Sequence, residues 1–382
     1  MQSEKGAKSL GRYAVSRRAI LRGSAAAAAA ASLPLGWTTP AHAAVSVSKV
    51  RNLVGNPGPT VGGIVATDLG IPVRVPGSSS KTLYIFGDSF TNAQMTQGWR
   101  SPVAMFSTTP NWLLNQGVFL NEAVGATSTQ PAKQIFNYTR SSFVFTTLPT
   151  DIIDINGTLY IFAAMLSSAN RDSVEMTGIW SSTDKGYTWN ATSAMFPGNK
   201  DGGNFQMVTW APRNKPNVQD DYIYLYTTAF NRKKALHMHR VKKANILNIN
   251  AYEPWGAINN QWNWGNPATD IMPGKFGELC LRLIGDKYLF TWLDHPSPAE
   301  ANIKALVLNE PWDNLFLAKP VTLISNTSWQ TQPQTGNLVS APYGGYIIPG
   351  SSLSNFHMVV SQWNIDDNSV YRTMQFRVSG LV

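Results

Sequence analysis

The stretch "GGIVATDLGIPVRVPGSSSKTLYIFGDSF" (residues 62–90) joins two apolar, partly β-branched runs through a cluster of Pro, Gly and Ser. Such runs, bounded by turn residues, are typical of two paired β-strands. The same unit recurs at four later places: residues 148–166, 204–230, 277–295 and 344–363. Almost no helical periodicity interrupts this pattern from Ala44 onward, so the sequence predicts an all-β protein.

Each unit has a strand marked by Gly or Pro, a turn and an aromatic-rich strand, and more polar segments follow. Five units at spacings of roughly 55 to 85 residues fit propeller blades with inserted loops, and a ring of blades removes long exposed strand edges. We therefore predict a five-bladed β-propeller as a single domain over residues 44–382. The segment "VSVSKVRNLVG" (residues 45–55) is expected to return as the outer strand of the last blade.

The segment "STDKGYTW" (residues 182–189) has the Ser-x-Asp-x-Gly-x-Thr-Trp spacing of an Asp-box hairpin. In that hairpin Ser182 and Asp184 hydrogen-bond the turn backbone, as short polar side chains do in turns, and Trp189 packs beneath it. We assign this segment a structural role and no catalytic one.

Residues 1–43 have the features of a twin-arginine signal peptide. "SRRAILRG" (residues 16–23) has paired arginines, an Ala-rich run follows, and "AHA" (residues 41–43) supplies the small residues of a cleavage site. The apolar run is short and dominated by Ala, which argues against a membrane span. We expect cleavage after Ala43 and a secreted, extracellular protein.

The full chain has a formal net charge of +9, but the leader holds six basic residues against one acidic residue. The rest of the chain is only weakly basic, about +4, with its Lys and Arg scattered, so the composition gives no case for nucleic-acid binding. Cys280 is the only cysteine, which excludes an intramolecular disulfide. We expect Cys280 to be a small buried hydrophobic residue and the protein to be a monomer.

The Gly-Asp-Ser sequence at residues 87–89 also suggests a GDSL-type esterase with Ser89 as its nucleophile. A serine hydroxyl needs a histidine base, which in such esterases lies in an Asp-x-x-His sequence. The histidines outside the leader have no aspartate three positions before them: His237, His239, His295 and His357. The Gly-x-Asn-Asp block and the helices of that fold are also missing, so the esterase interpretation is disfavoured.

The "HMH" stretch (residues 237–239) would place two imidazoles on one face of a strand, where they could bind a metal ion. No third ligand stands at a telling spacing, so an exposed polar face of a third strand is the preferred interpretation. We expect no metal and no cofactor.

Two aspartates follow the apolar runs of the first unit, Asp68 after "GGIVAT" and Asp88 after "TLYIFG". If both close their strands, both carboxyl groups reach one mouth of the propeller, where loops display functional groups. Glycoside hydrolysis requires two such groups, one as acid and the other as nucleophile or base. Because aspartates beside glycine also cap turns, the residues alone leave the catalytic and the structural interpretation equally open.

Nine ordered segments resemble one known family: "TDLGIP", "FGDSF", "GWRS", "LPTDIIDINGTLYIF", "NFQM", "YIYLYTTAFNR", "GELCLR", "YGGYIIPG" and "SQWN". That actinobacterial family was long catalogued only as a domain of unknown function. It is associated with endo-D-arabinanases, which cut the α-linked D-arabinofuranose polymers of mycobacterial arabinogalactan and lipoarabinomannan. The resemblance covers essentially all of residues 44–382 and implies a five-bladed propeller with a catalytic pair at Asp68 and Asp88.

The resemblance also implies candidates for binding D-arabinan. They are Arg100 and Trp99 of "GWRS", Asn204 and Gln206 of "NFQM", Glu278 of "GELCLR" as a third acid, and Gln362 and Trp363 of "SQWN". Each has a structural alternative, because the arginine could form an ion pair, the amides could pack against the next blade, and the tryptophans could fill gaps between blades. "GWRSP" and "FNRKK" depart from the family pattern, so the loops that select the substrate are expected to differ.

Two further classes stay open on the sequence alone. A non-catalytic propeller that binds envelope polysaccharide would use the same aromatic and polar residues. A sialidase is suggested by the Asp-box but needs three arginines on the inner strands, and only Arg100, Arg232 and Arg282 lie near such positions.

Overall fold

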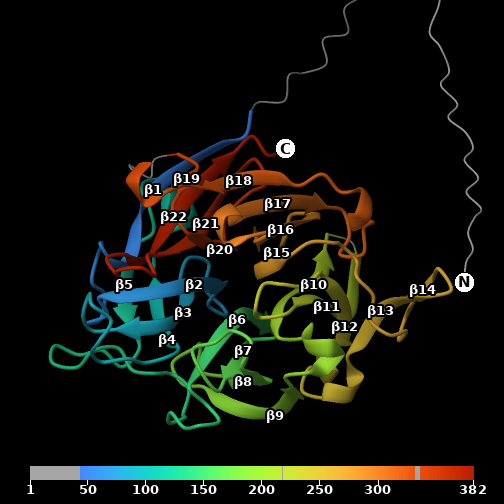
Figure 1. Cartoon of the computed structure of the whole chain (residues 1–382), viewed down its shortest axis with the longest axis horizontal. Coiled ribbons are helices and arrows are strands. Elements are labelled where there is room, and N and C mark those ends of the chain that lie inside the picture. The colour runs from blue at the N-terminus through green and yellow to red at the C-terminus, as the bar shows by residue number, and fades with distance from the viewer. Residues whose placement is uncertain (1–43, 217, 332–335) are drawn as a thin grey trace, which may run out of the picture. The chain divides into compact units, whose positions relative to one another are not determined.

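The computed structural model describes residues 44–216, 218–331 and 336–382, and its strands form five sheets. One strand from each sheet lies innermost around a common axis (Figure 1): β2 (Ala66–Arg74), β6 (Thr146–Ile155), β10 (Met207–Lys215), β15 (Phe276–Ile284) and β20 (Pro342–Ile347). Each inner strand contacts the next, and β20 contacts β2, so the ring is closed. The prediction of an all-β, five-bladed propeller is confirmed, whereas the predicted leader lies outside the described residues.

The remaining strands lie outward from these five, and we number the blades in chain order from β2. Blades 1 and 2 add β3 (Thr82–Phe90), β4 (Val103–Ser107), β5 (Leu120–Ala123), β7 (Thr158–Leu166), β8 (Val174–Ser182) and β9 (Asn190–Pro197). Blade 3 adds β11 (Val218–Thr228), β12 (His237–Lys242), β13 (Glu253–Ile258) and β14 (Gln261–Trp264). Blade 4 adds β16 (Lys287–Asp294), β17 (Asn302–Leu308), β18 (Val321–Asn326) and β19 (Leu338–Val339), and blade 5 adds β21 (Asn355–Trp363), β22 (Tyr371–Ser379) and β1 (Ser46–Asn56).

The helical elements in the described part of the chain are short 3-10 turns. They are η1 (Asn111–Gln116), η2 (Lys200–Gly203), η3 (Lys243–Asn245), η4 (Ile249–Ala251), η5 (Pro298–Glu300), η6 (Leu315–Leu317) and η7 (Trp329–Thr331). Within the described ranges, no helix has the length and apolar character that crossing a bilayer requires.

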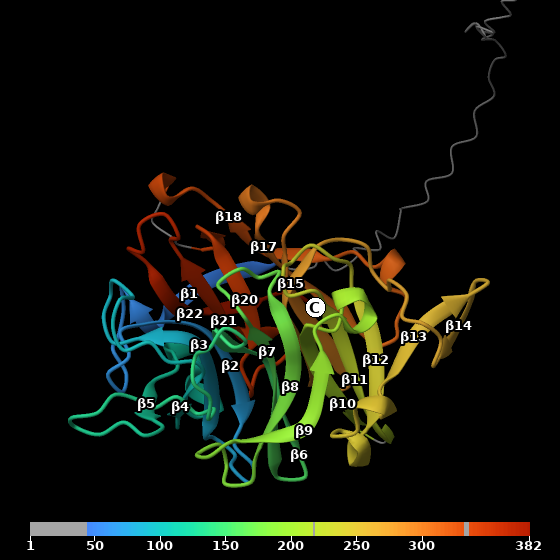
Figure 2. The same ribbon diagram turned by 60° about the horizontal axis from the view of Figure 1, so that its bottom comes forward.

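Strand β1 is the outer strand of blade 5, as the sequence predicted. It pairs antiparallel with β22 over its whole length, from Ser46 opposite Ser379 to Asn56 opposite Tyr371. The first strand of the propeller therefore belongs to the last blade, and this pairing covers an edge that blade 5 would otherwise expose. In Figure 2, which is turned by 60° from the view of Figure 1, β1 lies beside β22.

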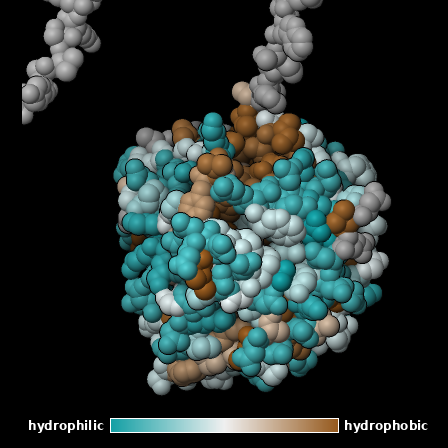
Figure 3. All heavy atoms as spheres, turned by 90° about the vertical axis from the view of Figure 1, so that its right-hand side faces the viewer, coloured by the Kyte–Doolittle hydropathy of each residue, from teal (hydrophilic) through white to brown (hydrophobic). Residues whose placement is uncertain are grey.

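Hydrophobic side chains fill the space between neighbouring sheets. Phe136 stacks on Trp180 with 4.3 Å between the ring centroids, and Trp189 of the Asp-box packs against the same phenylalanine. Asp184 Oδ1 accepts the backbone N–H groups of Tyr187 at 3.1 Å and Thr188 at 2.9 Å, which is the expected hairpin. The side of the molecule that carries β13 and β14 is mainly hydrophilic, with hydrophobic residues gathered in separate patches (Figure 3).

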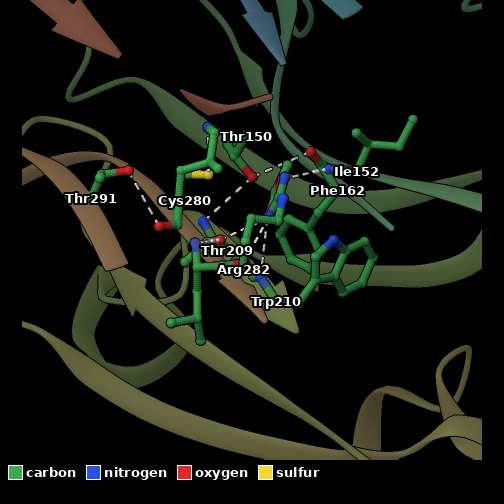
Figure 4. A network of polar contacts seen from close by, with 12 residues as sticks. Thr150, Ile152, Phe162, Thr209, Trp210, Cys280, Arg282 and Thr291 are labelled. Atoms are coloured by element: carbon green, nitrogen blue, oxygen red, sulfur yellow. Dashed lines mark hydrogen bonds and ion pairs between the residues drawn. The ribbon is translucent and has the colours of Figure 1, made fainter. Parts of the chain in front are cut away.

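A buried ion pair joins blades 2 and 4 near the axis (Figure 4). Asp151 on β6 is fully buried, and both Nη atoms of Arg282 on β15 donate to its carboxylate, Nη1 at 2.9 Å. Thr209 on β10 donates to Asp151 Oδ2 at 2.7 Å and accepts the N–H of Leu281 at 2.8 Å. Three inner strands are thus tied together, next to Cys280, which is buried as predicted.

Candidate functional site

A cavity of about 320 Å³ lies where the inner strands begin and where the loops after the second strands meet. Every blade contributes to its lining: Asp68 and Asp88 from blade 1, Arg171 from blade 2, Arg232 from blade 3, Glu278 from blade 4 and Tyr343 from blade 5. A concave site with a few convergent charged groups is the usual form of a small-molecule or substrate site.

The two aspartates share this cavity for a different reason than the sequence suggested. Asp88 lies near the end of β3, but Asp68 lies near the start of β2, so the expectation that both close their strands is wrong for Asp68. The two strands run antiparallel, with Thr67 opposite Ser89. The start of one strand and the end of the other therefore face the same mouth.

A β-bulge directs Asp68 toward the cavity. The register between β2 and β3 breaks on both sides of Leu69, whose φ is 64°, and the Leu69 N–H donates to Ser361 Oγ of blade 5 at 2.8 Å. Gly87 on the facing strand leaves the necessary space, since a Cβ there would lie 2.5 Å from Asp68 Oδ1. Bulges commonly re-aim a side chain beside a functional site.

The Asp68 carboxyl group lies in an environment that favours its protonated form. Burial and then the charge of Asp88 raise the pKa of Asp68 to about 7, against an opposing effect of the Tyr371 and Tyr343 hydroxyls. Tyr343 donates to Asp68 Oδ2 at 3.0 Å, while Oδ1 is buried without a hydrogen-bond partner. A carboxyl group with this pKa can carry a proton near neutral pH.

The Asp88 carboxyl group has more partners that stabilise its charge. Its Oδ1 accepts hydrogen bonds from Trp99 Nε1 at 2.9 Å and from Thr146 Oγ1 at 2.8 Å. Burial raises the pKa of Asp88, and the bonds from Thr146 and Trp99 and the charge of Arg140 oppose that rise. The Arg140 guanidinium lies 3.3 Å from the ring centroid of Trp99 and so covers the bonded indole.

The raised pKa of Asp68 predicts a stability difference that depends on pH. Because the pKa of Asp68 is about 7 in the folded protein against an ordinary value of 3.8, the group's contribution to stability is fully present below about pH 4 and is lost as the pH rises through 7. At pH 8 we expect Asp68→Asn to be more stable than the parent protein. The difference in unfolding free energy between the two proteins should favour the variant by about 1–3 kcal/mol more at pH 8 than at pH 4. Chemical denaturation of both proteins at the two pH values measures this, and an equal difference at both would contradict it.

A second group of charged residues lines the cavity, and its members come from blades 2, 3 and 4. Arg232 donates to Glu278 Oε1 through Nε at 3.1 Å and also through Nη2, and both side chains are buried. Gly277 makes room for this pair, since a Cβ there would lie 2.7 Å from Arg232 Cγ. Arg171 lies nearby in the β7–β8 loop, and the charge of Arg232, followed by burial, lowers its pKa to about 10.

Apolar side chains make up much of the remaining lining. Phe90, Phe145, Phe230 and Trp363 border the polar groups. Trp363 Nε1 donates to Asn368 Oδ1 at 3.0 Å, which fixes the indole at the cavity edge. Aromatic faces beside hydrogen-bonding groups suit a sugar, which presents C–H faces and hydroxyl groups.

Trp99 and Arg100 do not line the cavity. Trp99 acts on the site through its hydrogen bond to Asp88. Arg100 donates from Nε to the Gly98 carbonyl at 2.9 Å and from Nη1 to the Ala132 carbonyl, so it holds loops of blade 1.

The three predicted amides also lie away from the cavity lining. Asn204 Nδ2 lies 3.1 Å from His237 Nε2. Gln206 accepts the N–H of Phe230 at 3.0 Å and thereby positions a residue that does line the cavity. Gln362 is buried and accepts from Arg372 Nε at 3.1 Å.

The hydroxyl of Ser89 is unsuited to nucleophilic attack. Ser89 is fully buried, lies 2.7 Å from Thr67 Oγ1 and donates to the Gly87 carbonyl at 3.0 Å. No histidine in the described part of the chain is hydrogen-bonded to the Ser89 hydroxyl. The serine therefore supports the strand end that carries Asp88.

The "HMH" histidines are buried, so the expectation of an exposed polar face is wrong. His239 Nε2 lies 2.8 Å from Asp201 Oδ2, and His237 Nε2 lies 3.0 Å from Asp270 Oδ1. Asp201 belongs to the connection that leads into blade 3, and Asp270 belongs to the one that leads out of it. Among residues 44–216, 218–331 and 336–382, no three His, Cys, Asp or Glu side chains are grouped to hold a metal ion.

Sequence reasoning missed several residues of the site: Arg140, Thr146, Arg171, Tyr343 and Tyr371. Tyr343 stands inside the "YGGYIIPG" segment at the start of an inner strand, so its position could have indicated a role. Arg171 stands in an irregular loop, and no pattern marks it.

Comparison with known proteins gives the family of the chain. A Mycolicibacterium smegmatis protein, described as an uncharacterized 35.9 kDa protein in the asd 3' region, is 25% identical over 337 residues, which cover 84% of this chain and 94% of that protein. A solved structure of a Bacteroides ovatus protein is 13% identical with a TM-score of 0.57, covering 87% of this chain and 90% of that one, and it shows the same fold. The native arabinanase Arb43A of Bacillus subtilis is 11% identical with a TM-score of 0.48, covering 87% and 95%. The family model "Domain of unknown function (DUF4185)" matches residues 59–377, so the chain belongs to that family.

Proposed function

We propose that the protein is a glycoside hydrolase that cleaves internal α-D-arabinofuranosyl linkages in D-arabinan of the arabinogalactan and lipoarabinomannan type. The observation that carries this proposal is the pair of partly buried carboxyl groups, Asp68 and Asp88, in one cavity. The choice of D-arabinan rests on the sequence resemblance. We further propose that the protein acts outside the cell as a monomer, after export and removal of residues 1–43.

The two aspartates take different roles in this proposal. Asp68, with a pKa of about 7, is the acid that gives its proton to the glycosidic oxygen as the C–O bond breaks. Asp88, held by Trp99 and Thr146, is the carboxylate that attacks the anomeric carbon or takes a proton from an attacking water. When two neighbouring carboxyl groups have environments that favour different protonation states, one can be assigned as the acid and the other as the nucleophile or base.

The direct test is incubation of the purified protein with D-arabinan and, separately, with L-arabinan, followed by sizing of the products. Endo action on D-arabinan is expected to give a ladder of oligosaccharides and new reducing ends, with none from L-arabinan. Retention of the protein on D-arabinan without new reducing ends would contradict hydrolysis and favour a binding propeller.

The roles predict a bell-shaped dependence of kcat/KM on pH. Activity is expected to fall as the pH rises above about 7, because Asp68 then loses the proton it has to donate. Activity is also expected to fall in acid, where Asp88 becomes protonated. The Tyr343 hydroxyl lowers the pKa of Asp68, so Tyr343→Phe should move the alkaline limb to higher pH. An alkaline limb that stays in place in this variant would contradict the assignment of Asp68.

A further inference from the structure

The charged cluster of Arg171, Arg232 and Glu278 contains groups that the protein leaves without partners. Arg232 satisfies only Oε1 of Glu278, and Oε2 is buried without a hydrogen-bond partner. Arg171 lines the same cavity, and no other group in the described ranges lies within hydrogen-bonding or ion-pair distance of its guanidinium. A donor group and an acceptor group thus both lack a partner on one side of the cavity.

The cluster lies close to the carboxyl pair. Tyr343 connects the two, because its hydroxyl donates to Asp68 at 3.0 Å and its ring centroid lies 5.4 Å from the Arg232 guanidinium carbon. Glu278 and Asp68 also interact electrostatically. Tyr343 thus contacts both the proposed acid and the arginine that bonds Glu278.

The unpartnered groups indicate the chemistry of the ligand. Glu278 Oε2 needs a donor, and the Arg171 guanidinium needs an acceptor. A hydroxyl group can donate to one and accept from the other, and a neighbouring hydroxyl can accept a second guanidinium N–H. An anionic substituent would satisfy Arg171 but would be repelled by Glu278, which makes a neutral polyhydroxylated ring the better match.

We infer that Arg171 and Glu278 form a hydroxyl-binding subsite for the sugar unit whose bond is cut, with Arg232 holding Glu278 in place. This inference rests on the proposed function and deepens it, because it assigns the residues that select the sugar. Arg171 is the specificity-determining residue. Recognition of a hydroxyl by a charged group discriminates strongly against an analogue that lacks the hydroxyl.

The test uses a chromogenic D-arabino-oligosaccharide and analogues that each lack one hydroxyl group on the sugar whose bond is cut. Arg171→Met is expected to lower kcat/KM on the parent substrate about 10- to 100-fold, the range for a hydrogen bond to a charged group. The loss should shrink to less than about 5-fold on at least one deoxy analogue, because that analogue cannot make the deleted bond. Glu278→Gln should give the same pattern.

Arg171→Met should leave the midpoint of thermal unfolding unchanged or slightly raised, since its guanidinium makes no bond in the described structure. Arg51→Met is the matched control. Its guanidinium stacks on Phe119 at 3.7 Å on the outer strand β1, so this variant should lose no activity on any of the substrates. An Arg171→Met loss that is equal on all substrates would overturn the inference, because it would indicate only an electrostatic or structural effect.

Calorimetric titration separates this inference from the proposed function. The parent protein and Arg171→Met are titrated with an unlabelled D-arabino-oligosaccharide and with sodium phosphate. Weaker sugar binding in Arg171→Met supports the inference even if the parent protein hydrolyses no arabinan, in which case the proposed function alone fails. If phosphate binds and Arg171→Met loses only the phosphate, the site is for an anion and the inference is overturned.

Discussion

Asp88→Asn is expected to lower kcat/KM on D-arabinan by at least about 10³-fold, since removal of a group that forms or breaks bonds in the transition state costs factors of this size. The amide keeps the shape of the side chain and can still accept the hydrogen bonds from Trp99 and Thr146. It cannot serve as a nucleophile or base. The measurement is initial-rate release of reducing ends, together with circular dichroism to show that the variant is folded.

Asp68→Asn should give a loss of similar size on D-arabinan but a smaller one on a substrate with a leaving group that needs no proton. A dinitrophenyl glycoside is such a substrate, because its phenolate leaves unprotonated at neutral pH. Activity on this glycoside should remain low in Asp88→Asn and should recover in Asp68→Asn. The opposite pattern would mean that the two aspartates exchange their proposed roles.

Ser89→Ala provides the control for both variants. Ser89 is buried and bonded to Thr67, so its loss should reduce stability slightly and leave hydrolysis intact. Loss of activity in Ser89→Ala, with full activity in Asp88→Asn, would contradict the glycosidase proposal and restore the esterase interpretation.

The blades could be predicted because their signal is local. Each inner strand and its neighbour form a run of apolar residues between turn residues, and five repeats of that run are visible without any knowledge of long-range contacts. Even the closure by β1 followed from the pattern, since a leftover strand at the start of the chain needs a sheet edge to pair with.

The arrangement of the site could not be predicted from the same signal. The bulge at Leu69 shifts the register that alternation assumes, and it depends on Ser361, which lies 292 positions away in the chain. Arg171 reaches the cavity from an irregular loop, and Asn204 and Gln362, which looked like sugar ligands, satisfy buried groups inside the protein. Hydrogen-bond partners on other strands and loops decide these roles, and periodicity carries no information about them.

Arg282→Met is expected to destabilise the protein by about 3–5 kcal/mol, which is the usual cost of leaving a buried charge without its partner. Asp151 is fully buried and accepts hydrogen bonds from both Nη atoms of Arg282. The variant would therefore retain a carboxylate with no counterion beside it. Thr209 would still donate to Asp151, but a neutral hydroxyl compensates the charge only in part. Urea denaturation at pH 7 measures the change in the free energy of unfolding.

Lys233→Met is the matched control for this prediction. Its ion pair with Asp172 has a similar length, 3.1 Å, but the two side chains are 64% and 47% exposed. An exposed pair contributes about 0–1 kcal/mol, so this variant should unfold at nearly the same urea concentration as the parent protein. Adding Asp151→Asn to Arg282→Met should recover part of the lost stability, because the double variant buries no unpaired charge. If Arg282→Met costs no more than Lys233→Met, or if the double variant is less stable than Arg282→Met alone, the buried pair does not hold the inner strands together.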